Sequence, residues 1–501
     1  MALNSVKLSP ANDPAHPLGP GAASEVLVVG AGATGLALAC DLARRGVRVR
    51  LVERGEALFP GSRGKGVQPR TQEVFDDLGV IAAVRAAGGR YPQMLNWVDD
   101  HPQRSWDLIT PVDEDPGTPY RHPWMVPQWR TQEILLARLR ELGGEVEFGT
   151  ALVGLSQDPD GVEAVLERAG GRRTRVRTAY LVGADGGRSA VRAAVGVAMR
   201  GETVDPRPAL VADVRVDGLD RGNWHLWAHA PGGPLMLCPL VGTDDFQLYA
   251  QFDDGEPDSS PAAVRAVIAA RTPLEAGAVR EVRWSSVYRP RAALADRYRV
   301  GRVLLAGDAA HVHSPAGGQG LNTGVQDAYN LGWKLGRVLR HGAPEQLLDS
   351  YEQERRPVAA GVLGLSTSLH RAGRDGGAAS VQRGSHTSQL AVGYPLGPLT
   401  VEARRGLPQD ALRAGDRVPD AALPPGRLFD LLRGPHATLL AVGRPAPLLE
   451  GPAQPELLVR ECAELAPFGP GYFLIRPDGY LGLATEDPAD LPPYLALIAG
   501  R

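Results

Sequence analysis

Two separated glycine-rich stretches constrain this chain most, because each places glycines between an apolar strand and a helix. The first runs from Val26 to Arg54 as VLVVGAGATGLALACDLARRGVRVRLVER. The second runs from Gly301 to Leu335 as GRVLLAGDAAHVHSPAGGQGLNTGVQDAYNLGWKL. The first is typical of a mononucleotide-binding βαβ unit, and the second predicts a strand, an acidic turn, a loop and a helix. Together they predict one large bipartite cofactor, held at its pyrophosphate and at its redox ring.

The first stretch contains a GxGxxG motif formed by Gly30, Gly32 and Gly35. In this motif one glycine permits a tight turn, the next lets the backbone approach a pyrophosphate, and the third allows close helix packing. Glu53 ends the next predicted strand, where an acidic side chain binds a ribose hydroxyl. The motif predicts a dinucleotide but leaves both FAD and NAD open.

The second stretch favours FAD. Asp308 follows an apolar strand, where a carboxylate accepts hydrogen bonds from a polyol chain. Pro315, Gly318 and Gly320 let the backbone approach a flat ring, and the helix predicted from Leu321 directs its N-terminal N–H groups at that ring. A reduced flavin carries negative charge that a helix N-terminus stabilises.

Composition bounds the class of protein. The chain has 501 residues, 43% of them hydrophobic and 22% charged, which predicts an ordinary globular protein of two or three domains. A formal net charge of -3 argues against a nucleic-acid partner. The three cysteines, Cys40, Cys238 and Cys462, are far apart and match no metal or disulfide pattern, so we expect no metal and a reducing, cytoplasmic location. No apolar stretch predicts a signal peptide or a membrane span.

The remaining pattern predicts the elements between and after the two stretches. Short apolar runs from about 209 to 252, separated by Gly, Asp and Pro, indicate an antiparallel sheet. The turn DPDG predicts a hairpin of strands 152–155 and 162–166, and helices are expected at 36–45, 132–142 and 321–339. Near the C-terminus, ATLLAVG and GYFLIRPDG read as strands and PELLVRECAEL as a helix.

Three sequence fingerprints resemble the group A flavoprotein monooxygenases of the p-hydroxybenzoate hydroxylase fold. They are GAGATG, the GADG at Gly183 to Gly186, and AGDAAH at Ala306 to His311, and they occur in the family's order. SRGKGVQPRTQEVF, from Ser62 to Phe75, resembles the family's arginine segment. RLFDLLRGPHATLL and YFLIRPDGY resemble the thioredoxin-like appendix of the larger phenol, polyketide and rifampicin hydroxylases.

The resemblance implies an α/β fold class: a Rossmann-like FAD-binding domain of the glutathione-reductase type, an inserted antiparallel-sheet substrate domain and a C-terminal thioredoxin-like domain. The expected boundaries are a disordered tail at 1–24; the FAD-binding domain at 25–95, 126–205 and 291–372; the substrate domain at 96–125 and 206–290; a linker at 373–393; and the thioredoxin-like domain at 394–501. With only Cys462 in the last domain, we expect it to serve packing or a homodimer contact rather than thiol redox chemistry.

The resemblance also implies the cofactor-binding residues. Those expected to hold the ADP half and pyrophosphate of FAD are Gly30, Gly32, Ala33, Thr34, Gly35, Glu53, Arg54 and Arg63. Those expected along the ribityl chain, the flavin ring and the nicotinamide cofactor are Gln128, Asp185, Gly186, Asp308, Pro315, Gly318, Gly320, Leu321 and Asn322. The family often has a glutamate four residues after Gln128, where this chain has Gln132, so the start of that helix stays open.

Two histidines and six tryptophans have competing interpretations. His311 and His313 resemble a metal pair in spacing, but no carboxylate or cysteine cluster accompanies them, and the family pattern makes His311 structural. His313 and Pro315 are candidates for the substrate pocket, and no catalytic base is assigned. Tryptophans 97, 106, 124, 129, 224 and 227 fall in or beside the substrate region, where they either line a pocket or fill the core.

The implied function is hydroxylation of an aromatic substrate, a phenol or a polycyclic polyketide of an antibiotic pathway. The family uses NADPH or NADH to reduce FAD, adds O2 to form a flavin C4a-hydroperoxide, and transfers the distal oxygen to an electron-rich ring. Two alternatives stay open. One is Baeyer–Villiger, epoxidising or N-oxidising chemistry at the same flavin, and the other is a non-catalytic FAD-binding chaperone of an unstable intermediate.

Overall fold

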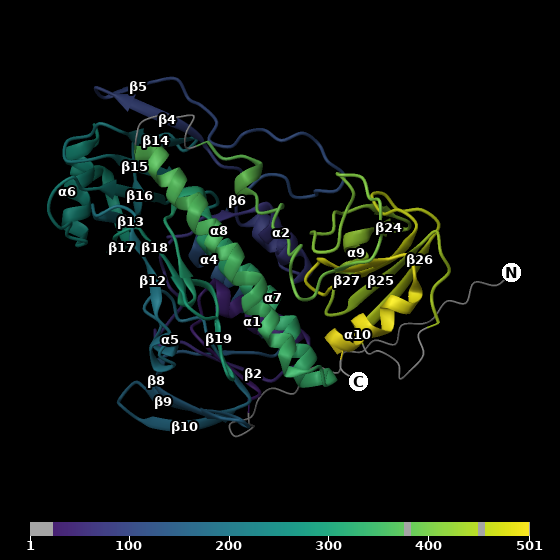
Figure 1. Cartoon of the computed structure of the whole chain (residues 1–501). Helices are drawn as coiled ribbons and strands as arrows, with labels where there is room; N and C mark the ends of the chain where they lie inside the picture. Colours follow the sequence, from purple (N-terminus) through teal and green to yellow (C-terminus); the bar gives the residue numbers. More distant parts are fainter. Residues whose placement is uncertain (1–23, 375–381, 449–455, 500–501) are drawn as a thin grey trace.

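Figure 1 shows the computed structural model of the chain, which describes residues 24–374, 382–448 and 456–499. Of the tail predicted at 1–24, all but Ser24 lies outside the described residues. No described helix combines the length and the apolar character needed to cross a membrane.

A six-stranded sheet organises the larger part of the molecule. Its strands, in spatial order, are β19 (Arg299–Val300), β20 (Val303–Leu305), β11 (Tyr180–Gly183), β1 (Val26–Val29), β2 (Val49–Val52) and β7 (Val146–Glu147). All neighbours are parallel except β19 and β20. Every residue of β1 is buried, as its unbroken apolar sequence predicts for a central parallel strand.

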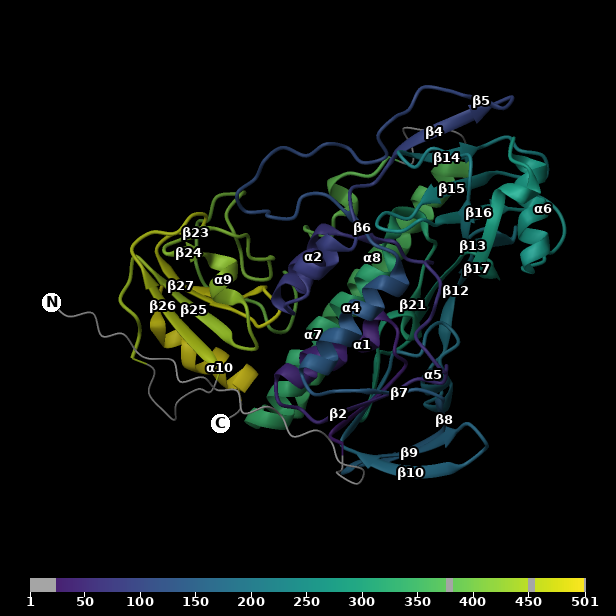
Figure 2. The ribbon, with the colours of Figure 1, turned by 180° about the vertical axis from the view of Figure 1, so that it is seen from behind.

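Helices pack side by side on this sheet (Figure 2). α1 (Ala33–Arg44) contacts both α4 (Gln128–Glu141) and α7 (Gly320–His341), and α7 also contacts α2 (Pro69–Asp77) and α8 (Asp349–Arg374). α1 begins three residues before the predicted start, directly at the glycine motif. α4 begins at Gln128, after Pro127, which settles the helix start that the sequence left open.

A seven-stranded sheet forms the second layer. It consists of β17 (Val279–Tyr288), β13 (Ala209–Val216), β16 (Phe246–Gln251), β15 (Leu235–Pro239), β14 (Asn223–Trp227), β4 (Gln93–Val98) and β5 (His101–Pro102). All its neighbours are antiparallel except β14 and β4, so the antiparallel sheet predicted from the short apolar runs is observed. α6 (Pro261–Arg271) contributes Val264 and Ile268 to the core of this sheet.

Smaller sheets link these layers. The predicted hairpin around DPDG forms β8 (Thr150–Asp158) and β9 (Gly161–Arg168), which pair with β10 (Arg173–Thr178). A second sheet joins β12 (Met199–Thr203), β18 (Arg291–Ala295) and β21 (His311–Val312). A third pairs β3 (Gly66–Val67) with β6 (Trp124–Met125). β21 and β3 thus lie in small sheets of their own. Short helices in this part include α3 (Ile81–Ala86), α5 (Ala190–Ala194) and the 3-10 helix η4 (Glu345–Leu348).

The C-terminal residues form a separate five-stranded sheet, drawn in yellow at one side of Figure 1. Its order is β22 (Val401–Glu402), β28 (Leu481–Thr485), β27 (Gly471–Ile475), β25 (Ala437–Val442) and β26 (Leu457–Cys462), flanked by α9 (Leu428–Leu432) and α10 (Leu491–Ala499), with the small hairpin of β23 (Ala422–Leu423) and β24 (Gly426–Arg427) beside it. The parallel pair of β25 with β26 and the antiparallel pairs through β27 give it the predicted thioredoxin-like arrangement.

One element prediction in this domain is wrong. The segment PELLVRECAEL, predicted as a helix, contains the strand β26. Its leucines and glutamates favour a helix locally, but Leu457 to Cys462 pair residue by residue with the buried strand β25. The backbone hydrogen bonds of that pairing override a weak local propensity.

The residues predicted as a linker at 373–393 are only partly described, and those after 381 pack against the rest of the chain. Arg383 exchanges backbone hydrogen bonds with Leu108 and Thr110. Gln389 is buried, accepts a hydrogen bond from Gln326 of α7 at 2.6 Å and donates one to Thr323 at 3.1 Å. This segment therefore lies beside the start of α7.

Buried charges join the C-terminal domain to helices α7 and α8. Arg476 pairs with Glu354 of α8 at 2.6 Å and with Asp478 at 2.6 Å, and Lys334 of α7 pairs with Glu354 at 2.7 Å. Burial alone would raise the pKa of Glu354, but Arg476 and Lys334 hold it at about 2. Trp333 of α7 belongs to the apolar core of the same domain. The domain is thus fixed to the cofactor-side helices by apolar and charged contacts together.

Replacing Arg476 by methionine tests this attachment. Arg476→Met leaves the buried carboxylates of Glu354 and Asp478 with one fewer cation, so we expect a loss of about 3–5 kcal/mol in the free energy of unfolding. Urea unfolding of the full chain measures it. Arg405→Met, at an exposed position of the same domain, should change stability by no more than about 0.5 kcal/mol. Equal stabilities of the two variants would show that the ion pairs do not hold the domain.

Candidate cofactor and substrate site

The glycine motif leaves open space at the N-terminus of α1. Gly30 has φ +104°, and a Cβ there would lie 2.4 Å from the carbonyl oxygen of Ala184. By contrast, a Cβ on Gly32 would meet no atom within 4 Å. No side chain caps α1, so its first N–H groups face this space. A helix N-terminus with free donors and open approach is suited to a phosphate group.

Glu53 lies at the carboxyl end of β2 and is held by backbone donors. Its Oε2 accepts a hydrogen bond from the Ala31 N–H and its Oε1 accepts one from the Gly55 N–H, both at 2.9 Å. The carboxylate is therefore fixed beside the glycine motif, as its predicted ribose role requires. Arg54 is exposed next to it.

Thr34 brings the two glycine-rich stretches together. Ideal Cβ atoms on Gly307 and Gly324 would lie 2.6 Å and 2.4 Å from the Thr34 hydroxyl oxygen. α1 therefore packs so closely on the turn after β20 and on α7 that neither glycine position has room for a side chain. Ala33 and Gly35, on either side of Thr34, are buried, and a Cβ on Gly35 would lie 1.9 Å from the carbonyl oxygen of Gly30.

Asp308 lies in the 3-10 turn η2 (Gly307–Ala309), beyond the end of β20 rather than in the strand. The residue keeps accessible surface, yet burial of its carboxyl among protein atoms raises its pKa. The carboxyl is therefore close to other protein atoms but open to solvent on one side. The positive charge of Arg63 acts against the effect of burial on this pKa, so the guanidinium lies in the neighbourhood of Asp308.

Arg63 is clamped between aromatic rings. Its guanidinium carbon lies 5.5 Å from the ring centroids of both Phe59 and Trp284, and its Nη2 donates to the Ser286 hydroxyl at 2.6 Å. These contacts fix the Arg63 guanidinium. Asp308 and Arg63 supply one anionic and one cationic group to this part of the molecule, which suits the hydroxyls and phosphates of a nucleotide.

Asn322 fixes the loop between Pro315 and α7. Its side-chain nitrogen donates to the carbonyls of Gly66 and Gly318 at 2.8 Å, and its Oδ1 accepts from the Gln68 N–H at 2.8 Å. Because two of these hydrogen bonds tie the loop to strand β3 and the residue after it, and the third closes the loop on itself, its backbone forms a rigid surface for a flat ring. Pro315 stays exposed beside it.

Other predicted residues meet at the same place. Gln128 accepts a hydrogen bond from the Gly64 N–H at 2.9 Å, and a Cβ on Gly64 would lie 3.2 Å from the Leu321 side chain. A Cβ on Gly320 would lie 3.6 Å from the His313 ring. The structure therefore brings Gln128, Leu321 and Gly320 together at the start of α7.

Asp185 has a local structural role. Its carboxylate accepts hydrogen bonds from the Ser189 hydroxyl at 2.5 Å and from the Ala190 N–H at 2.6 Å, at the start of α5. Gly186 has φ +81° and open space around its Cβ position. A contact of these two residues with FAD or the nicotinamide cofactor stays a prediction.

The two histidines form a chain with Asp327. His311 Nε2 lies 2.6 Å from Asp327 Oδ2, and His311 Nδ1 lies 3.1 Å from His313 Nε2. Asp327 also pairs with Arg355 at 2.7 Å. Burial, reinforced by the charge of His311, lowers the pKa of His313 to about 3. No group of three metal-binding side chains occurs within the described parts of the chain.

Three of the predicted tryptophans show two different surroundings. Trp97, Trp227 and the ring of His225 stack within the second sheet, where they serve its core. Trp224 instead lies under the ammonium group of Lys65, at 4.5 Å. Lys65, Tyr91 and Arg383 border the same region and were not predicted. The position of Lys65, two residues after Arg63 in the same segment, was the one available sequence signal.

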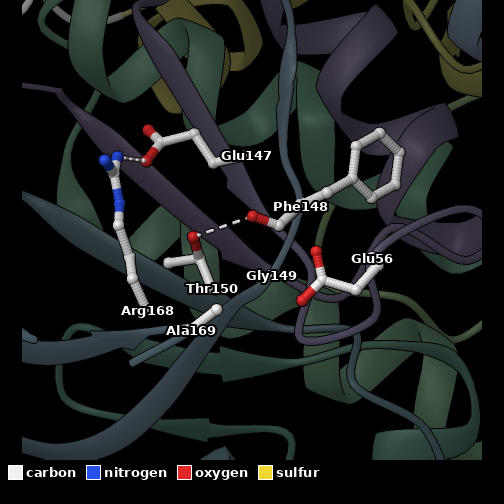
Figure 3. A pocket seen from close by; sticks show the side chains of 7 residues that line it. All are labelled: Glu56, Glu147, Phe148, Gly149, Thr150, Arg168 and Ala169. Atoms are coloured by element: carbon white, nitrogen blue, oxygen red, sulfur yellow. Dashed lines mark hydrogen bonds and ion pairs between the residues drawn. The ribbon is translucent and has the colours of Figure 1, made fainter. Parts of the chain in front are cut away.

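A cavity of about 400 Å³ lies away from the flavin-type residues (Figure 3). It is lined by Glu56, Glu147, Phe148, Gly149, Thr150, Arg168 and Ala169. Two of its charged groups pair with each other, since Glu147 binds Arg168 at 2.9 Å. It adjoins the loop that begins at Glu53, but none of the residues predicted at the flavin ring line it.

Comparison with known proteins identifies the class. The family described as FAD binding domain matches residues 23–366. A flavin-dependent monooxygenase of Mycobacteroides abscessus is 45% identical over 488 residues, which cover 94% of this chain and 99% of that protein. The solved anhydrotetracycline hydroxylase of Streptomyces rimosus is 31% identical, covers 96% of this chain and 100% of that one, and superposes with a TM-score of 0.73.

A further solved structure, aklavinone-11 hydroxylase in a ternary complex with FAD and aklavinone, is 30% identical, with a TM-score of 0.75 and coverage of 95% and 99%. The fold and site thus define an FAD-binding protein. The chain belongs to the FAD-dependent monooxygenases, with FAD as cofactor and NAD(P)H as reductant. The open space at Gly32, the carboxylate of Asp308 and the fixed loop at Asn322 fit that cofactor.

Gly32→Ala tests where the pyrophosphate binds. The new methyl group meets no protein atom, so the apoprotein should unfold at the wild-type temperature. We expect FAD to bind at least about tenfold more weakly, because the methyl group takes the place of the approaching phosphate. Fluorescence titration of the apoprotein with FAD measures this.

Gly277→Ala is the matched control, because its Cβ position is equally open and lies in a remote 3-10 turn. Equal FAD affinities for the two variants would place the pyrophosphate elsewhere.

Proposed function

We propose that this monooxygenase hydroxylates a polycyclic phenolic substrate of the polyketide type. The observation that carries the proposal is the combination of a complete FAD framework with a second sheet that borders the flavin loop. The relatives named for anhydrotetracycline and aklavinone, both aligned over nearly their whole length, support this substrate class. FAD, when bound, accepts electrons from NAD(P)H and activates O2 for transfer to the aromatic ring.

The residues of this chain supply binding, positioning and exclusion of water. In the proposal, Gly32 and the N-terminus of α1 hold the pyrophosphate, and Glu53 holds a ribose. Asp308 and Arg63 bind the part of FAD that lies between its pyrophosphate and its flavin ring. The loop from Gly318 to Asn322, rigid through the hydrogen bonds of Asn322, supports the ring. A fixed ring beside a closed substrate region favours oxygen transfer over loss of peroxide to water.

The domain boundaries predicted from the sequence are part of this proposal. They are supported by the seven-stranded sheet, which draws strands from both sides of α4 in the chain, and by the sheet after residue 400. We also propose a cytoplasmic location, supported by three cysteines that form no disulfide. A homodimer through the C-terminal domain is proposed on sequence grounds only.

Two other functions are kept as alternatives. Baeyer–Villiger, epoxidising or N-oxidising chemistry uses the same flavin site and differs in the product. A non-catalytic FAD chaperone would use the same cofactor contacts without turnover. The intact loop around Asn322 favours an active flavin over the second alternative.

NADPH oxidation by the purified yellow protein, with peroxide quantified, tests the proposal. A panel should run from simple phenols to polycyclic naphthols and anthraquinols. We expect a polycyclic phenol to stimulate NADPH oxidation at least about tenfold with little peroxide, because a bound substrate is positioned for oxygen transfer. The product should gain one oxygen atom from labelled O2, on a ring carbon.

An oxygen inserted beside a carbonyl would favour Baeyer–Villiger chemistry. Flavin that NADPH does not reduce, with or without any member of the panel, would favour the chaperone. Stimulation by simple phenols alone would contradict the polycyclic substrate class.

A further inference from the structure

Two cations without a carboxylate partner lie together on the second-sheet side of the flavin loop. Lys65, between β2 and β3, donates a hydrogen bond to Gln247 Oε1, and its ammonium lies 4.5 Å from the ring centroid of Trp224. Arg383, from the segment after α8, has its guanidinium carbon 5.7 Å from the ring centroid of Tyr91. Within the described ranges, neither cation forms an ion pair.

The two cations share one neighbourhood. Burial raises the pKa of the Cys238 thiol to about 11, and the positive charges of Lys65 and Arg383 both act against that increase. The rings of Tyr91 and Trp224 lie 6.5 Å apart, centroid to centroid, in the same cluster. Residues from four separate chain segments thus surround Cys238, and they include two positive charges.

This neighbourhood borders the flavin loop. A Cβ on Gly318 would lie 3.6 Å from Arg383 Nη1. The Tyr91 hydroxyl lies directly over Gly66, whose carbonyl accepts a hydrogen bond from Asn322. Lys65 and Arg383 both keep accessible surface, although burial lowers the pKa of Lys65. The two cations therefore lie half-buried at the edge of the ring-binding loop.

Within the described residues, the nearby carboxylate of Asp213 forms no direct ion pair with either cation. Asp213 of β13 accepts a hydrogen bond from the Ser62 hydroxyl, and burial raises its pKa to about 6, although the charge of Lys65 acts against that increase. A half-buried ammonium or guanidinium group without a directly paired counter-ion loses part of its hydration, and a bound anion offsets that loss. Nearby charges of one sign, with a hydroxyl donor between them, form a binding site for an oxygen anion.

We propose that Lys65 and Arg383 bind the ionised hydroxyl of the aromatic substrate, a phenolate or the enolate of a hydroxyquinone, with Tyr91 as a neutral donor. This inference rests on the proposed function and names the form in which the substrate binds. An ionised oxygen donates electron density to its ring, and an electron-rich ring accepts oxygen more readily. Lys65 and Arg383 would thereby select acidic phenols and place the ionised oxygen at the edge of the flavin loop.

Binding to the oxidised holoenzyme tests the site without turnover. The probes are 2-hydroxy-1,4-naphthoquinone, whose acidic hydroxyl is ionised at neutral pH, and its 2-methoxy ether, which is neutral and of similar shape. Changes in flavin absorbance report the Kd of each. We expect wild type to bind the hydroxy compound at least about tenfold more tightly, as charge-assisted hydrogen bonds predict.

Four variants separate a specific role from a structural one. Lys65→Met and Arg383→Met should each raise the Kd of the hydroxy compound about tenfold. The Kd of the methoxy ether should change by no more than about twofold. Lys65→Arg should retain most of the preference, because it keeps the charge. Arg280→Met, at an exposed and paired position of β17, is the control and should behave as wild type. Flavin content verifies that each variant is folded.

Equal affinity of wild type for the two probes would overturn the proposal. An equal loss of affinity for both probes in Lys65→Met would overturn it as well. A loss confined to the Kd for NADPH would assign the cations to a phosphate of the nicotinamide cofactor and overturn it as well. Failure of the proposed function would appear separately, as NADPH oxidation that no phenol stimulates, because these titrations need no turnover.

Discussion

The contact of Thr34 with Gly307 and Gly324 is the constraint on which the rest of the site depends. It joins the first helix of the nucleotide motif to the turn that carries Asp308 and to the helix that follows the flavin loop. Because a single added carbon at either glycine would lie within 2.6 Å of Thr34, the helices can approach only with this combination of small residues. A side chain at either position would separate the half of the site that binds phosphate from the half that holds the ring.

Buried hydrogen bonds and ion pairs connect this contact to the surrounding elements. Asn322 ties the flavin loop to strand β3, and the segment that precedes β3 carries Arg63 and Lys65. Asp327 of α7 holds His311 and Arg355, while Glu354 of α8 holds Arg476 of the last domain. Each of these charges is buried with a partner, as stability in a low-dielectric interior requires. Lys65 and Arg383 differ from this pattern, and that difference is what indicates a ligand at their position.

The sequence predicted the parts of this structure that are encoded locally. The glycine spacing around Gly30, the apolar strand before it and the acidic residue at Glu53 are all within one βαβ unit, so their relation is fixed by short-range geometry. The family resemblance added the order of the domains and the roles of individual residues. Asp308 was expected in an acidic turn after a strand, and it lies in the 3-10 turn that follows β20.

What the sequence did not predict depends on tertiary contacts. Lys65 and Arg383 are separated by more than three hundred positions, and neither lies in a regular element whose period would place it. The leucines and glutamates of β26 have helical propensity and predict a helix. The strand forms because its residues pair with those of β25. The buried ion pairs of Arg476 could not be predicted from the sequence either, because a charged residue is by default expected to be exposed.

The most direct test of the account is a crystal structure of the protein with FAD bound. The account predicts the pyrophosphate in the open space at Gly32 and the flavin ring against the backbone from Gly318 to Asn322. One edge of that ring should face the Lys65 ammonium and the Arg383 guanidinium. A flavin ring bound in the cavity lined by Glu56 and Arg168, or a ring turned away from the two cations, would contradict it.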